Sequence, residues 1–320
     1  MMKPLLGIGT IAVLLFSGTA SAEPKLCFLK ALPQDRQAAL ADDVKLLIGW
    51  TFDAYAAGYH FDGTITIDHD SAYAEVPGFA DPTQMQHLAG RYRIIRAPFD
   101  RDRGYYGILF AALDQQDRPV ALILANRLFR VPVALQHPLG LTTDLLTNTA
   151  LIFDFSTKGT EDALSAAEAS YDSAAGLGVP LILAGQSQAG ATAQFQAASL
   201  QKSHAGWPVP AGFLSINAAE ALRSVRGLDL DPAAVDGINF SKDYDPGVGP
   251  HGPFANAIGQ QVYIHPDGTG GSTPGDYSFF DALIHPKEHM LSTFDDVSLT
   301  DALRPLLDTV PECSPAGGRA

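Results

Sequence analysis

A single serine stands where an apolar run meets a cluster of small residues. The stretch VPLILAGQSQAGATAQ, residues 179–194, predicts a buried strand that turns directly into a helix at Ser187. Gly185 precedes the turn, and Ala189 and Gly190 follow it. This pattern is typical of a strained elbow that exposes a nucleophilic hydroxyl at a sheet edge, beside the positive end of a helix. The alternative is a serine that only caps an ordinary helix.

The elbow departs from the strict pattern G-x-S-x-G, because Ala189 stands at the second glycine position. An alanine fits there if Gly190 makes the closest contact between the helix and the strand.

A nucleophilic serine needs a general base and an acid that orients it, and in this kind of fold both follow the serine along the chain. The segment INFSKDYDPGVGP, residues 238–250, offers Asp243 and Asp245. We prefer Asp245, because the proline and glycine after it place it at the turn that ends a strand. Asp243 is the second choice, and both can also be aspartates that only cap the turn.

The base is expected among the histidines that follow the acid. His289 is preferred, because HPKEHMLSTF places it where a loop turns into a helix anchored by apolar residues. His285 and His265 each precede a proline, and His251 follows the acid too closely. Each of these histidines can instead be structural.

The elements that must hold these residues alternate between strands and helices. Such alternation predicts an α/β fold with a mostly parallel central sheet, an N-terminal antiparallel hairpin and helices on both faces. Helices are expected at 33–57, 161–178, 191–202 and 298–310, and strands at 105–114, 120–126, 179–185, 211–218, 235–245 and 259–266.

The bulk composition excludes some classes of partner. The 320 residues are 46% hydrophobic and 18% charged, and the formal net charge is −14. An acidic chain disfavours binding nucleic acid and docking on anionic lipid by charge, because like charges repel. Neutral or apolar substrates remain compatible with this composition.

The N-terminus predicts export. Lys3, an apolar core and the small residues Ala20 and Ala22 resemble a secretory signal peptide over residues 1–22, with a membrane anchor as the alternative. The remainder, 23–320, is expected to be one domain. In an oxidising compartment Cys27 and Cys313 are expected to form a disulfide.

One segment has the composition of a loop. HPDGTGGSTPGD, residues 265–276, is expected to be a mobile surface loop, and its aspartates do not match a known calcium-loop spacing.

Together these motifs resemble the class 3 lipase-like branch of the α/β-hydrolase superfamily, over roughly Tyr92 to Thr293. The family's nucleophile turn reads like G-H-S-L-G-G-A, and here it reads GQSQAGA, residues 185–191. NFSKDYDP is similar to the family's acid loop, and EHMLSTF to its histidine segment. The resemblance implies an α/β-hydrolase fold and a triad of Ser187, Asp245 and His289.

The strand that carries an oxyanion donor in the family has a different end in this sequence. It normally ends in R-G-T or R-G-S, but here it ends in ANRLF, residues 125–129. The oxyanion donors implied are therefore the backbone N–H of Gln188 and that of Arg127 or Leu128. The apolar segment that follows, Asn126 to Leu141, is expected to be either a lid or acyl-binding wall, or a buried connector.

The resulting hypothesis is a secreted or periplasmic serine hydrolase of carboxylic esters, a lipase or esterase that works through an acyl-enzyme. This mechanism uses no metal and no organic cofactor. The expected partner is a small-molecule or lipid ester, with neither nucleic acid nor stable membrane insertion. The alternatives are a phospholipase or polyester hydrolase, and a weak or inactive binding protein on the same fold.

Overall fold

The computed structural model describes residues 26–57, 88, 90–96, 99–100, 105–128, 158–204, 208–219, 221, 228–245, 249–250, 258–275, 294, 296–310 and 313. These residues form one nine-stranded sheet in the order β1-β3-β4-β5-β6-β7-β8-β9, with β2 paired to β3. The strands are β1 Tyr92–Arg96, β2 Phe99–Asp100, β3 Tyr105–Leu113, β4 Pro119–Leu128, β5 Leu181–Gln186, β6 Ala211–Ile216, β7 Gly237–Lys242, β8 Gln260–Ile264 and β9 Gly270–Gly271.

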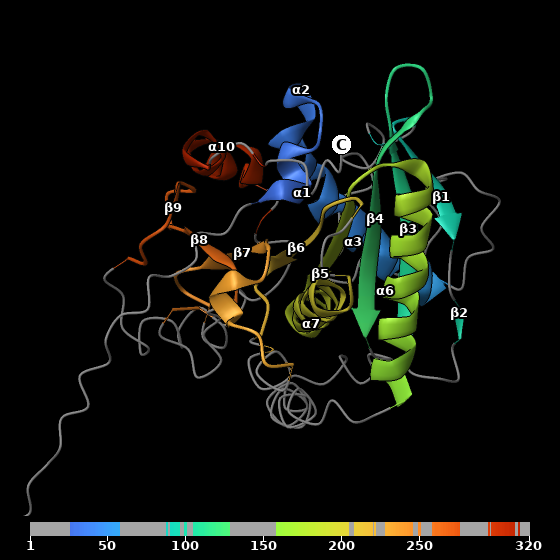
Figure 1. The fold of residues 1–320 in the computed structure, drawn as a ribbon. Coiled ribbons are helices and arrows are strands. Elements are labelled where there is room, and N and C mark those ends of the chain that lie inside the picture. Colours follow the sequence, from blue (N-terminus) through green and yellow to red (C-terminus); the bar gives the residue numbers. More distant parts are fainter. Residues whose placement is uncertain are drawn as a thin grey trace, which may run out of the picture.

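The helices flank this sheet (Figure 1). They are α1 Cys27–Lys30, α2 Gln34–Gln37, α3 Ala39–Ala57, α6 Lys158–Leu177, α7 Ser187–Ser203 and α10 Leu299–Thr309, with a 3₁₀ turn η3 at Pro232–Ala234. The helix expected at 33–57 is therefore present as two, α2 and α3.

The predicted hairpin is the antiparallel pair β3–β4, in which Tyr105 pairs with Leu128. Its turn is closed by Asp114, whose Oδ1 accepts hydrogen bonds from the N–H groups of Gln116 and Arg118. β1 extends the antiparallel edge by pairing with β3. The sequence patterns did not predict β1.

From β4 to β8 every neighbouring pair of strands is parallel. The carboxyl ends of these strands therefore meet at one edge of the sheet, the edge at which ligands bind in open α/β sheets. The predicted α/β-hydrolase fold, with its antiparallel hairpin and its mostly parallel sheet, is confirmed by this order.

Each strand divides its apolar side chains between two cores. In β5, Ile182 and Ala184 join the core beneath α3 and α10, whereas Leu181 and Leu183 join the core beneath α6 and α7. Successive side chains of a strand point to opposite faces, so a strand with a continuous apolar run requires cover on both sides. Figure 1 shows α6 in front of β3 and β4 and α3 behind the strands.

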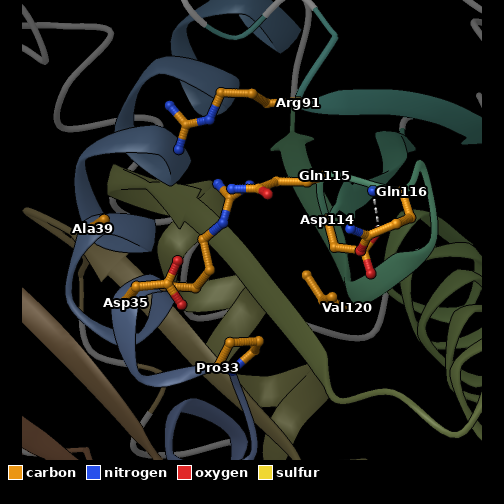
Figure 2. Close-up of a pocket in the computed structure, with 9 residues that line it drawn as sticks. Pro33, Asp35, Ala39, Arg91, Asp114, Gln115, Gln116 and Val120 are labelled. Atoms are coloured by element: carbon orange, nitrogen blue, oxygen red, sulfur yellow. Dashed lines mark hydrogen bonds between the residues drawn. The ribbon is translucent and has the colours of Figure 1, made fainter.

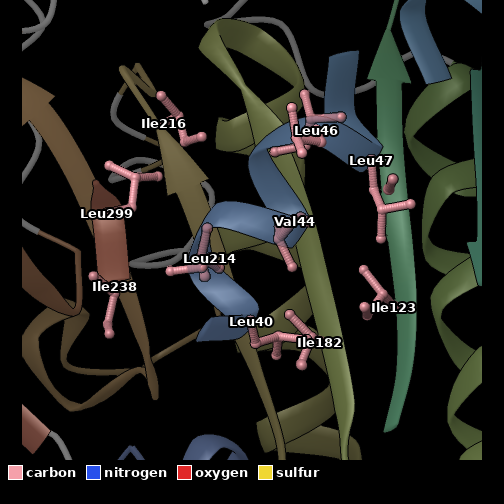
Figure 3. Close-up of a cluster of buried hydrophobic side chains, with 14 of the residues drawn as sticks. Leu40, Val44, Leu46, Leu47, Ile123, Ile182, Leu214, Ile216, Ile238 and Leu299 are labelled. Carbon is pink, nitrogen blue, oxygen red and sulfur yellow. The ribbon is translucent and has the colours of Figure 1, made fainter. Parts of the chain in front are cut away.

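The α3 core follows helical spacing. Leu40, Val44 and Leu47 lie on one face of α3 and join the same core cluster as Ile123, Ile182 and Leu214 of the sheet (Figure 3). Residues three and four apart share one face of a helix, which explains why this helix lies flat on the sheet.

The glycine-rich segment expected to be a loop contains a short strand. His265 N–H donates to the Thr269 carbonyl, and Gly270–Gly271 form β9, which pairs antiparallel with β8. The predicted surface position of 265–275 is confirmed, since these residues are exposed or half-buried, and the two-residue strand β9 within the segment was not expected.

The predicted disulfide between Cys27 and Cys313 is present, with the two Cα atoms 5.6 Å apart. It ties the start of α1 to the C-terminal segment. The predicted signal peptide, residues 1–22, lies outside the described residues. None of the helices described is long and apolar enough to span a bilayer.

Candidate active site

Ser187 sits at the turn between β5 and α7, as predicted. Its φ is +55°, a left-handed backbone conformation that a non-glycine residue adopts only at a cost of about 1–3 kcal/mol. The strand ends at Gln186 and the helix begins at Ser187 with no residue between them. The serine side chain is half-buried, so it lies at the surface of the fold rather than in either core.

Two glycines make this turn possible. A Cβ on Gly185 would lie 2.4 Å from the carbonyl carbon and oxygen of Ala189. A Cβ on Gly190 would lie 2.5 Å from the Cβ of Ala218 and 3.1 Å from the Gly185 carbonyl oxygen. The closest contacts thus fall on Gly185 and Gly190, which explains why an alanine is accepted at position 189.

The first turn of α7 supplies backbone donors beside the serine. The first four N–H groups of a helix have no partner within the helix, and they carry partial positive charge. The N-cap residue Gln186 makes no side-chain capping bond. The N–H of Gln188, one of the expected oxyanion donors, belongs to this turn.

The second expected donor, Leu128, ends β4 at the level of the serine. The last pair of the β4–β5 ladder is Ala125 with Ala184. Leu128 is three residues after Ala125, and Ser187 is three residues after Ala184, so the two residues are at the same level. The N–H of Leu122 donates to the Pro180 carbonyl, and N–H directions alternate along a strand. The N–H of Leu128 is therefore on the side of β4 that faces β5, whereas that of Arg127 faces β3.

A buried polar chain joins this end of β4 to α7. The Tyr105 hydroxyl donates to Asn126 Oδ1 at 2.6 Å, and Asn126 Nδ2 donates to Gln196 Oε1 at 2.7 Å and to the Ala184 carbonyl at 3.2 Å. Gln196 in turn donates to the Ala163 carbonyl of α6. Burial raises the pKa of Tyr105 well above its usual value. The chain locks β3, β4 and α7 together next to the candidate oxyanion strand.

Both candidate acids follow β7 and both are buried. The main chain of Asp245 closes the turn: its N–H donates to the Lys242 carbonyl at 3.1 Å, and its carbonyl accepts from Gly249 N–H at 3.1 Å. Asp243 comes one position after the Lys242–Ile264 pair of the β7–β8 ladder. His265 occupies the matching position after β8, so the two side chains are neighbours across parallel strands.

Asp243 and His265 form a hydrogen bond, with Oδ2 of the aspartate 2.5 Å from Nδ1 of the histidine. The aspartate side chain is fully buried and the histidine side chain is 26% exposed. Burial raises the pKa of nearby Tyr263, and the negative charge of Asp243 raises it further. The pairing of the second-choice acid with a histidine ranked below His289 was not expected from the sequence.

The segment after the candidate base is anchored close to the acid turn. The ammonium of Lys45, buried in α3, donates to the carbonyls of Phe294 and Val297 at 2.7 and 3.2 Å. The fully buried ring of Phe294 also lies 5.2 Å from Nζ of Lys242. Lys242 immediately precedes Asp243, so the chain at residue 294 passes beside the end of β7.

Several predicted features lie outside the described residues. These are the preferred base His289, the alternatives His285 and His251, and the lid or connector from position 129 onward.

Sequence reasoning also missed the roles of Asn126 and Lys45. A signal existed for both, since each is a polar residue within an apolar run and therefore needs a buried partner.

A separate cavity of about 380 Å³ lies at the turn end of the β3–β4 hairpin (Figure 2). Arg36 and Arg91 line it together with Asp35 and Asp114. Arg91 is neutralised by Asp43, at 2.7 Å. β4 begins beside this cavity and ends level with Ser187, so the cavity is at the opposite end of the strand from the candidate active site.

No protein-family model matches the chain, and no curated protein matches it. Among solved structures, an MDLA mutant from Penicillium cyclopium is 13% identical, the match covers 82% of this chain and 98% of that chain, and the TM-score is 0.43. The Rhizomucor miehei lipase–propeptide complex is 12% identical, covers 85% of this chain and 81% of its own, and has a TM-score of 0.43.

Lipase II from Rhizopus niveus is 13% identical, covers 83% of this chain and 93% of its own, and has a TM-score of 0.36. These likenesses concern the fold. The α/β-hydrolase architecture of the chain is read from its own sheet order and from the turn at Ser187.

Proposed function

We propose that this α/β-hydrolase-fold chain is a secreted serine hydrolase of carboxylic esters, an esterase or lipase, with Ser187 as its nucleophile. The observation that carries the proposal is the left-handed φ of +55° at a half-buried serine, directly between a parallel strand and a helix. A strained conformation of this kind persists only where the surroundings enforce it, and such residues cluster at functional sites. Here the close contacts at Gly185 and Gly190 hold Ser187 in this conformation.

In the proposed reaction, Ser187 Oγ adds to the ester carbonyl carbon while the imidazole of His289 takes the hydroxyl proton. The tetrahedral oxyanion accepts hydrogen bonds from the N–H groups of Gln188 and Leu128. Collapse of the intermediate breaks the bond to the alcohol, which leaves with the proton from the imidazole. Water then adds to the acyl-enzyme by the same route and releases the acid and the free serine.

The position of Phe294 supports His289 as the base. Phe294 lies against Lys242 at the end of β7, and His289 is five residues earlier in the chain. Five residues span at most about 17 Å, so the chain can deliver an imidazole to the acid turn. The acid is Asp245 or Asp243, both of which lie at that turn.

The substrate is proposed to be a neutral ester with an apolar acyl chain. The acidic composition disfavours anionic polymers. The apolar sequence that follows β4, from position 129 onward, is the proposed wall for the acyl chain. Phospholipids and polyesters share the same ester chemistry, and a panel of p-nitrophenyl esters, triglycerides, phospholipids and polyester would rank them. A signal peptide over 1–22 and the Cys27–Cys313 disulfide are consistent with export.

The test compares Ser187→Ala with Ser203→Ala on p-nitrophenyl butyrate. Ser203 is a matched control, because it is an exposed serine at the far end of the same helix. We expect kcat to fall by about 10³-fold or more for Ser187→Ala and to stay unchanged for Ser203→Ala. A fluorophosphonate probe should label the wild type and not Ser187→Ala. A wild-type protein that neither hydrolyses any ester of the panel nor reacts with the probe would instead be a binding protein on a hydrolase fold.

A further inference from the structure

Two neighbouring strands leave the sheet at the same level through the same unusual backbone conformation. Gln186 of β5 pairs with Ile216 of β6 in parallel register. The residues that follow them, Ser187 and Asn217, therefore come at one level, and their φ angles are +55° and +42°. A non-glycine residue keeps such a left-handed conformation only where its surroundings enforce it, and such residues cluster at functional sites. The buried Asn217 thus calls for an explanation of the same kind as Ser187.

The side chain of Asn217 takes the place of its own main-chain carbonyl. Asn217 N–H donates to the Phe240 carbonyl at 2.7 Å, as the parallel pairing of β6 with β7 requires. The next bond of such a ladder runs from Lys242 N–H to the main-chain carbonyl of residue 217. Here Lys242 N–H donates to Asn217 Oδ1 instead, at 3.0 Å. The ladder continues through the amide, and the main chain is free to turn away from the strand direction.

This turn places Ala218 beneath the nucleophile helix. Ala218 N–H donates to Asn239 Oδ1 at 3.3 Å, and a Cβ on Gly190 would lie 2.5 Å from the Ala218 Cβ. Gly190 belongs to the first turn of α7, which begins at Ser187. The contact between Gly190 and Ala218 therefore sets how close that turn lies to the sheet, and the backbone positions of Ser187 and Gln188 follow from it.

Asn239 is a fixed anchor for this turn. Its side chain is fully buried, and its Oδ1 also accepts from Ser215 Oγ at 2.9 Å. Its Nδ2 donates to Ser241 Oγ at 2.7 Å and to Gln261 Oε1 at 3.1 Å. Two donated and two accepted hydrogen bonds use the full capacity of an asparagine amide. A fully satisfied buried polar group holds one arrangement, so Ala218 is bound to a part of β7 that cannot shift easily.

We propose that Asn217 is a positioning residue for the nucleophile turn. Its left-handed backbone and its Oδ1 bond hold Ala218 against Gly190. That contact in turn fixes Ser187 Oγ and Gln188 N–H in the geometry that the oxyanion transition state requires. The inference rests on the proposed function and adds to it a residue that touches neither the substrate nor the reacting atoms. A displacement of about 1 Å at a reacting group can lower the rate by about 10²-fold, so a small shift of this turn is enough.

The first test separates the backbone conformation of Asn217 from its side-chain bond. Asn217→Gly keeps the left-handed backbone without strain and removes Oδ1, whereas Asn217→Asp keeps an acceptor oxygen on a residue that also adopts this conformation. With p-nitrophenyl butyrate as the substrate, kcat of Asn217→Gly should fall by about 10- to 100-fold at constant KM. Asn217→Asp should recover most of the loss. Equal losses in the two variants would overturn the role of Oδ1.

The rate at which a fluorophosphonate probe labels Ser187 gives a second readout. Labelling uses the same serine and the same oxyanion donors as the first step of hydrolysis. It should therefore slow for Asn217→Gly by about the same factor as kcat. An unchanged labelling rate together with a reduced kcat would contradict a displaced nucleophile turn.

Two matched controls separate positioning from folding. Asp117→Gly replaces another left-handed residue, with a φ of +59°, in the exposed turn of the β3–β4 hairpin, and it should leave kcat unchanged. Gln201→Leu removes an amide that donates to the Ala234 carbonyl at 3.1 Å near the far end of α7. It should lower the thermal unfolding midpoint and keep kcat. If Gln201→Leu loses as much kcat as Asn217→Gly, the positioning role is wrong.

Ala218→Gly tests the same contact should Asn217→Gly fail to fold. It deletes only the methyl group that faces Gly190, and it should lower kcat by roughly 3- to 10-fold at constant KM. If the wild type hydrolyses esters through Ser187 while Asn217→Gly or Ala218→Gly folds and keeps full kcat, only this inference fails. If the wild type has no Ser187-dependent activity, the proposed function itself fails.

Discussion

Gly190 and Ala218 meet where the first turn of α7 passes the end of β6, so closely that a Cβ on Gly190 would lie 2.5 Å from the Cβ of Ala218. The contact sets how near the nucleophile helix can come to the sheet. It also explains how a turn with alanine at position 189 still closes.

Gly190→Ala is therefore expected to destabilise the protein and to displace Ser187. Overpacking of this kind typically costs about 1–3 kcal/mol. Gly176→Ala is the matched control, since Gly176 is also helical but a Cβ there would have nothing within 4 Å. It should be neutral or stabilise by up to about 1 kcal/mol, because alanine is the better helix former. Urea unfolding measures both, and equal effects would refute the packing argument.

Leu128→Pro is expected to lower kcat by about 10²–10³-fold, because proline removes the proposed oxyanion N–H. That N–H faces β5, so its loss breaks no bond of the β3–β4 ladder. Leu128→Ala keeps the N–H and is the control. A stopped assay on p-nitrophenyl butyrate with both variants measures the effect; equal activity of the two would remove Leu128 from the oxyanion site.

Lys45→Met is expected to destabilise the fold by about 2–4 kcal/mol. The variant keeps the length of the side chain but leaves the carbonyls of Phe294 and Val297 without their charged donor. Lys202→Met, at an exposed position of α7, should change the free energy of unfolding by no more than about 0.5 kcal/mol. Guanidinium titrations of both variants test this, and a stable Lys45→Met protein would contradict it.

Stability is expected to fall as pH rises above 10. Burial, followed by the negative charge of Asp43, raises the pKa of Tyr92, and burial raises that of Tyr105. Below pH 10 both states keep these hydroxyls protonated, so they add no pH dependence. Above pH 10 the unfolded chain ionises first, and each tyrosine should remove about 1.4 kcal/mol per pH unit.

Unfolding curves from pH 8 to 11.5 measure this slope. Tyr92→Phe and Tyr105→Phe should each make the slope shallower, although both lower stability at pH 8 by removing a buried hydrogen bond of 2.6 Å. Curves parallel to the wild type would show that these hydroxyls do not set the alkaline limit.

The sequence by itself determined the alternation of strands and helices, the hairpin, the disulfide partners and the turn at Ser187. These features depend on local signals. Apolar runs, turn residues and small residues around a strand–helix junction act over a few positions, and two cysteines permit one pairing. The mostly parallel character of the sheet followed from the same patterns.

Only the tertiary structure decided which side chains meet at the carboxyl edge of the sheet. The contact of Asp243 with His265 depends on the register of β7 against β8, which brings two residues 22 positions apart to the same level. The proline and glycine after Asp245 mark a turn, and they carry no information about which carboxylate faces a neighbouring strand. β1 and β9 were missed for the same physical reason. Each is stabilised by hydrogen bonds to a partner strand, and the local sequence pattern does not indicate which strand that partner is.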